Sequence, residues 1–154
     1  LEALYRRMKE PSDALRVVCG DFNAPQLEPP NSPLFTFAQD PEAGGLRLKP
    51  ERWYRAVEPT TLWDPERWDR AERQVLESKD SELVDVYRLL HPDGHDVSWV
   101  WRGRGREVGR RFDHVIASCR MRPTAIHYRH DWRQRRNGLM LSDHSAVIVQ
   151  FEPC

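Results

Sequence analysis

The feature that most constrains the fold is a set of three short apolar runs, each joined to a polar motif. The runs cover 15–19, 112–118 and 146–151, a length and composition typical of buried strands. The motifs are Gly20-Asp21-Phe22-Asn23, Arg111-Phe112-Asp113-His114 and Ser142-Asp143-His144-Ser145. Because each motif lies at a strand end, we expect three carboxylates, an amide and an imidazole to meet at one rim of a sheet.

Helical patterns alternate with these strands and predict an α/β fold. Asp64-Pro65-Glu66 suits a helix start, and apolar residues then recur on one face through Ser78. We expect helices at 2–8, 33–39 and 64–78, a helix or helical turn at 81–90, strands at 97–102 and 125–129, and a hairpin connection at 104–109. The periodicity in 40–61 is weak and indicates an irregular segment. We expect one mixed β-sheet with helices on its outer face.

Length and composition indicate one domain in a reducing compartment. The 154 residues, 39% of them hydrophobic, suffice for a single core. No apolar stretch approaches the roughly 20 residues of a membrane span, so we expect a soluble, cytoplasmic protein. The three cysteines, Cys19, Cys119 and Cys154, lack metal-binding or redox spacing, and we expect Cys19 and Cys119 to be buried. The helical pattern starts at Leu1 without a cap, which favours a piece of a longer chain.

The formal net charge of zero conceals a basic segment. The window 99–136 holds eleven arginines against three acidic residues, Glu107, Asp113 and Asp131. Arginine binds phosphate through two hydrogen bonds, so the segment suits a polyanionic substrate. A solvated hairpin whose arginines pair with acidic residues elsewhere is the alternative.

The polar motifs suit the hydrolysis of a phosphoester. Asp143 can contact Mg²⁺ directly or through water. His144 can donate to a phosphoryl oxygen or transfer a proton, provided that Asp113 fixes its other ring nitrogen. Asp21 can polarise the attacking water, and Asn23 can bind phosphate. Taken singly, each motif also fits ordinary turn chemistry.

Five motifs in this order resemble the C-terminal half of the endonuclease/exonuclease/phosphatase superfamily, which includes exonuclease III, abasic-site endonucleases and DNase I-like enzymes. Besides the three motifs above, they are Leu83-Val84-Asp85-Val86-Tyr87-Arg88 and Ser98-Trp99. The resemblance covers 15–25 and 83–151, leaves a variable insertion at about 26–81, and implies that 1–154 is part of a single domain. It also implies half of a four-layer αββα sandwich and a cofactor of Mg²⁺ or Mn²⁺.

By resemblance the catalytic residues are Asp21, Asn23, Asp113 and His144, and Asp143 binds the metal. Trp99 falls where abasic-site enzymes carry an aromatic residue in the damaged-nucleotide pocket, although its alternating strand favours a core tryptophan. Arg111, or its neighbour Arg110, is expected to contact the phosphate of the substrate.

The resemblance implies a metal-dependent nuclease acting on DNA or RNA. A phosphatase or phosphodiesterase for lipid or sugar phosphates, and a non-catalytic binding module, are the alternatives. The family's N-terminal half supplies a metal-binding Glu and an early Asn, and residues 1–14 offer no substitute. We therefore expect this chain alone to be inactive and to require that missing half as a partner.

Overall fold

The computed structural model describes residues 1–29, 32–40, 47–50, 64–78, 81–134 and 139–152. Most of the irregular segment 40–61, with Trp53 and Tyr54, lies outside the described residues, as does Cys154. The helices are α1 (Glu2–Lys9), α3 (Pro65–Glu77) and α4 (Val86–Leu90), and two short 3-10 helices are η2 (Cys119–Met121) and η3 (His130–Arg133). The strands are β1 (Val17–Asp21), β2 (Leu83–Asp85), β3 (Trp99–Gly103), β4 (Arg106–Arg110), β5 (Asp113–Ser118), β6 (Pro123–Arg129) and β7 (Ala146–Phe151).

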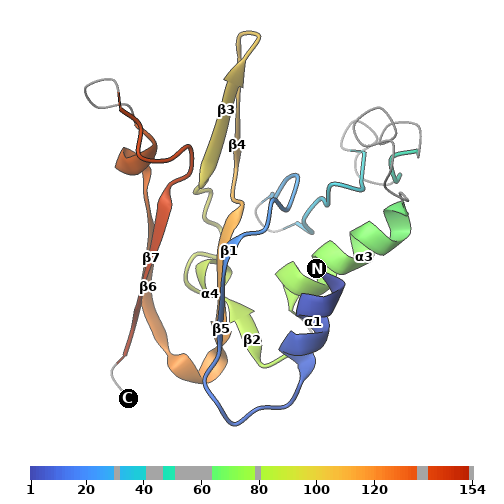
Figure 1. Ribbon diagram of the computed structural model, residues 1–154, viewed down its shortest axis with the longest axis vertical. Helices are drawn as coiled ribbons and strands as arrows, with labels where there is room; N and C mark the ends of the chain where they lie inside the picture. Colours follow the sequence, from blue (N-terminus) through green and yellow to red (C-terminus); the bar gives the residue numbers. More distant parts are fainter. Residues whose placement is uncertain (30–31, 41–46, 51–63, 79–80, 135–138, 153–154) are drawn as a thin grey trace.

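The strands form three small antiparallel sheets. The central sheet has the order β1-β5-β2, and β3-β4 and β6-β7 form two-stranded sheets. The expected α/β class is confirmed, whereas the single mixed sheet is wrong. In Figure 1 the β3-β4 hairpin projects from the top, the β6-β7 pair lies on one side of the central sheet, and α1 and α3 lie on the other.

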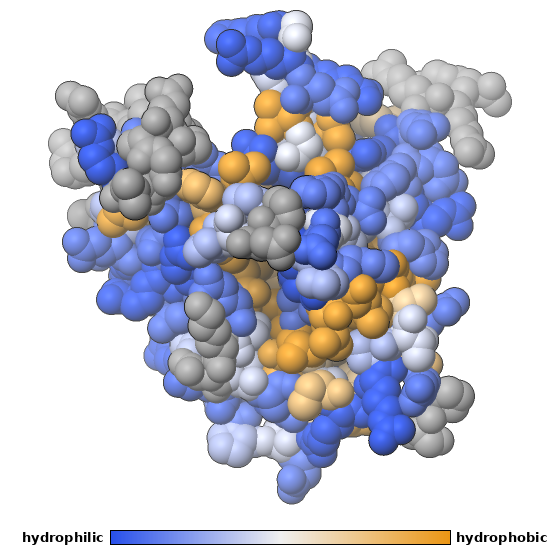
Figure 2. Space-filling model, turned by 180° about the vertical axis from the view of Figure 1, so that it is seen from behind, coloured by the Kyte–Doolittle hydropathy of each residue, from blue (hydrophilic) through white to orange (hydrophobic). Residues whose placement is uncertain are grey.

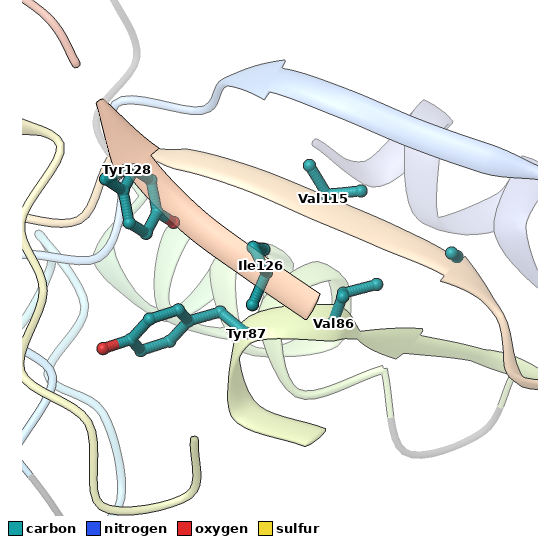
Figure 3. Close-up of a cluster of buried hydrophobic side chains, with 6 residues drawn as sticks. Val86, Tyr87, Val115, Ile126 and Tyr128 are labelled. Carbon is teal, nitrogen blue, oxygen red and sulfur yellow. The ribbon is translucent and has the colours of Figure 1, made fainter. Parts of the chain in front are cut away.

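The core lies on both faces of β5, because successive side chains of a strand point to opposite faces. Ile116 packs with Tyr5 and Met8 of α1 and Val75 of α3. Val115 and Ala117 face the other way, into a cluster with residues of α4 and β6. Figure 3 shows this second cluster, formed by Val86, Tyr87, Val115, Ile126 and Tyr128.

Helix α3 confirms the expected helix at 64–78 through its capping. The Asp64 side chain accepts a hydrogen bond from the backbone N–H of Arg67 at 3.0 Å, and Pro65 occupies the first turn. Ser78 ends the helix in the left-handed conformation. Ala71, Val75 and Leu76 form the buried face.

Two expected helices differ from the structure. No helix forms at 33–39, because its backbone pairs with the chain just before and just after it, in the bridges Leu27–Phe35 and Gln39–Leu48. The segment 81–90 begins as strand β2 and becomes helical only at Val86. The reason is that β2 pairs with β5, and the Asp85 side chain then caps α4 by accepting from the N–H of Arg88.

The expected burial of Cys19 and Cys119 is also wrong. Both thiols are free and exposed. Cys19 lies on β1, an edge strand whose residues are mostly exposed, and Cys119 begins η2. The valine-rich run therefore predicted strand β1 correctly, but it did not predict that Cys19 is exposed.

The hairpin is polar at its end and apolar at its base. Figure 2, seen from behind, shows hydrophilic residues at the projecting tip and apolar residues gathered below it. Among the described residues, no helix combines the length and the apolar composition that crossing a membrane requires.

Candidate functional site

An aspartate–histidine pair forms the centre of the candidate site. Nδ1 of His144 donates to Oδ2 of Asp113 at 2.7 Å. The other ring nitrogen, Nε2, lies 3.8 Å from Oδ2 of Asp21. The structure therefore brings together three of the expected side chains, from the end of β1, the start of β5 and the segment before β7.

Backbone contacts around Ser98 hold this pair in place. The fully buried Ser98 Oγ accepts from the N–H groups of Phe112 and Asp113 at 2.9 and 3.0 Å. Ser98 O accepts from the N–H of Ser145 at 2.7 Å, and Trp99 forms a β-bridge with His144. The start of β3 thus joins the two loops that carry the pair, a role that the sequence did not indicate.

Only the end of the Gly-Asp-Phe-Asn motif turns: Gly20 and Asp21 belong to β1 and pair with His114 and Asp113, and the chain turns at Asn23. Gly20 has φ +148°, a region that L-residues avoid, although a Cβ atom at this position would meet no neighbouring atom within 4 Å. Asn23 has φ +50°, and its N–H donates to Oδ1 of Asp21 at 2.8 Å. One oxygen of Asp21 therefore fixes the turn, and the other faces His144.

The surroundings of His144 favour its charged form. Burial opposes charging and would lower its pKa, but the hydrogen bond to Asp113 and the nearby carboxylates outweigh burial. The pKa of His144 consequently lies above its ordinary value of 6.5. The charged ring, which carries a proton on both nitrogens, can donate a proton or a hydrogen bond from Nε2.

The expected residues Asn23, Asp143 and Trp99 line one cavity with His144. This cavity has a volume of about 690 Å³, and Arg110 lines it as well. Asp143 and Asn23 are exposed, and Trp99 is partly buried and stacked on Phe112 at 5.3 Å between ring centroids. The indole of Trp99 therefore belongs to a wall of the cavity and to the packing beneath it.

Arg111 is the one expected site residue that lies apart from the group. Its side chain is buried, and it donates to Glu28 and Asp85 at distances from 2.6 to 3.1 Å. Burial opposes ionisation of Glu28, but hydrogen bonds from Arg111 and Arg88 outweigh it and lower its pKa to about 2. Arg111 is thus held within the fold, and Arg110 is the arginine beside the pair.

His114 connects this buried network to the turn that carries Asp21. The ring is fully buried, with Nδ1 3.1 Å from Oδ2 of Asp85 and Nε2 2.8 Å from the carbonyl oxygen of Ala24. Phe22 stacks on it at 5.5 Å between centroids. His114 was not expected to contribute, and no spacing in the sequence distinguishes it from a core residue.

The described residues do not form a complete metal site. Within the described residues, no group of three or more His, Cys, Asp or Glu side chains is arranged to hold a metal ion. Mg²⁺ requires about six oxygen ligands, several of which can be water. Asp143 and Asp21 could each offer a carboxylate, so the residues present do not fit a complete site.

Comparison with known proteins identifies no relative: no protein-family model, no curated protein and no solved structure matches the chain.

Proposed function

We propose that this chain contributes half of the active site of a divalent-metal-dependent phosphoesterase, a nuclease that hydrolyses phosphodiester bonds. The observation that carries the proposal is the Asp113–His144 pair, at 2.7 Å, with Asp21 on its far side. A histidine fixed at Nδ1 by a carboxylate and open at Nε2 is suited to proton transfer or to hydrogen bonding with a phosphoryl oxygen.

In this proposal each residue has a defined task. Asp113 holds the ring of His144 in one orientation and favours its protonated form. Nε2 then donates to a phosphoryl oxygen, where negative charge grows in the transition state. Asp21 accepts a proton from the attacking water, and Asn23 donates to a second phosphate oxygen.

Asp143 would offer one carboxylate to a divalent ion, which would supply positive charge to offset that of the phosphate. The remaining ligands would come from the other half of an αββα sandwich, as the motif resemblance implies.

Free Cys19 and Cys119 support a reducing compartment such as the cytoplasm.

The test uses a polypeptide that joins this chain to its proposed N-terminal half, assayed with Mg²⁺. Substrates would be duplex DNA, abasic-site DNA, single-stranded RNA and a generic phosphodiester. We expect cleavage that His144→Ala and Asp113→Asn both reduce by at least about 100-fold. Cleavage that survives both substitutions would remove the proposal, and folded but inactive protein would favour a binding module on the same scaffold.

A further inference from the structure

One face of the β3-β4 hairpin carries two tryptophans and an arginine. Trp99 pairs with Arg110 across the hairpin, and Trp101 pairs with Val108. Residues directly opposite, and residues two apart on one strand, share a face of a sheet. All four therefore point to the same side, where they line the cavity that also contains His144.

Trp101 offers an open aromatic surface in this cavity. Its side chain lies over Gly103, where a Cβ atom would meet the indole at 2.5 Å. Trp101 is 42% exposed and Trp68, on the facing helix α3, is 36% exposed. Phe37 lines the same cavity and packs on Phe112 at 5.9 Å between centroids. Aromatic rings thus line the cavity from three segments of the chain.

Arg110 adds a cation to this aromatic cavity. Its guanidinium hydrogen-bonds to the carbonyl oxygen of Gly109 at 3.1 Å. In the part of the chain that the structure describes, Arg110 forms no ion pair, unlike Arg111 and Arg102, and it is partly buried. A partly desolvated arginine without a carboxylate partner can bind an anionic group of a ligand.

We propose that this cavity binds one unpaired base of a nucleic acid, stacked on Trp101, while Arg110 binds the adjacent phosphate. A cavity of about 690 Å³ is large enough for a nucleotide. Indole and phenyl walls favour a flat ring over an acyl chain, and every base has a stacking face. A base paired in a duplex is not available, so the ligand is single-stranded or locally opened.

The inference rests on the proposed function, because it specifies the substrate of that same site. The inference goes beyond the proposed function because it requires a base beside the scissile phosphate. A lipid or sugar phosphate would satisfy Arg110 and His144 but would not need Trp101 and Trp68.

The test is binding of 12-nucleotide oligothymidylate, measured in EDTA by fluorescence polarisation with the same two-part polypeptide. The comparison ligands are oligouridylate and an abasic phosphodiester of equal length, with inositol hexakisphosphate as a competitor. Trp101→Ala should weaken binding of both base-containing ligands by about 5- to 150-fold, the loss of one stack, and should leave the abasic ligand unaffected. Trp132→Ala is the matched control, since Trp132 is 44% exposed on η3 and does not line the cavity.

Arg110→Ala provides a second readout that stacking alone would not change. It should weaken the base-containing and abasic ligands alike, and should reduce the slope of log K against log salt by about 0.7. Unfolding midpoints of all variants should match that of the unmodified protein.

Two outcomes would overturn the inference: equal binding of oligothymidylate and the abasic ligand, or equal effects of Trp101→Ala and Trp132→Ala. Displacement of oligothymidylate by inositol hexakisphosphate, without any effect of Trp101→Ala, would likewise refute it. With Mg²⁺ restored, hydrolysis of the abasic ligand as fast as of oligothymidylate would support the phosphodiesterase and refute the base pocket. Base-dependent binding without hydrolysis would support the pocket and refute the enzyme.

Discussion

Glu72 provides a quantitative test of the packing behind this cavity. It lies on α3, is almost fully buried, and accepts the backbone N–H of Phe37 at 3.2 and 3.0 Å through its two carboxylate oxygens. Burial raises its pKa from 4.5 to about 7, against the opposing effect of that hydrogen bond. The carboxyl therefore links α3 to the segment that carries Phe37.

The raised pKa of Glu72 makes its own contribution to stability depend on pH. The folded state holds the proton more tightly than the unfolded state, so the free energy of unfolding falls as pH rises from about 4.5 to about 7. Above about pH 7, Glu72 no longer changes the free energy of unfolding. The change in pKa corresponds to a loss of about 3 kcal/mol across that window.

Glu72→Gln isolates this contribution, because the amide remains neutral and its oxygen can still accept from Phe37 N–H. The measurement is urea unfolding at pH 4.5 and at pH 8. At pH 4.5 the variant and the unmodified protein should have similar free energies of unfolding. At pH 8 the variant should be more stable by about 2–3 kcal/mol. Glu66→Gln, at an exposed position of the same helix, is the control. A difference between Glu72→Gln and the unmodified protein that is the same at both pH values would refute the reasoning.

Three further predictions concern the pair, the buried arginine and the thiols. Asp113→Asn removes the hydrogen-bonded charge that raises the pKa of His144, so the pH–rate profile of the two-part enzyme should shift to lower pH; an unchanged profile would argue against the pairing. Arg111→Ala should lower the free energy of unfolding by about 3–5 kcal/mol, measured in urea, because it removes the cation shared by the buried Asp85 and the partly buried Glu28. Cys19 and Cys119 should react with a thiol reagent in the folded protein nearly as fast as in urea, and protection of either would contradict its exposure.

The sequence predicted the strand ends better than the side-chain environments. Short apolar runs with polar residues at their ends indicated β1, β5 and β7, and the Asp113–His144 pair followed from these ends meeting. Arg110 and Arg111 show that sequence patterns did not predict side-chain environments. They are adjacent and chemically identical, yet Arg110 lines the cavity whereas Arg111 is buried. Only the packing of the surrounding elements decides which of the two arginines lines the cavity and which is buried.

The expected helix at 33–39 failed for a related reason. Ser32 and Pro33 are local helix-start signals worth about 1 kcal/mol, whereas the segment makes several long-range contacts. Phe37 N–H donates to Glu72, and Thr36 Oγ1 donates to Asp69 at 2.7 Å. These partners lie more than 30 residues away, and so no local pattern could reveal them.

The buried network behind the site is best explained as support for the turn that carries Asp21. Arg111 joins Glu28 to Asp85, Asp85 contacts His114, and His114 contacts the carbonyl oxygen of Ala24, next to Asn23. Buried ion pairs add little net stability compared with apolar packing, so their value here is in fixing geometry. Under the proposed function Asp21 reacts with the attacking water, and a displacement of about 1 Å would cost about 100-fold in rate. Under that proposal Arg111 acts on the candidate site through the position of Asp21 and not through contact with a substrate.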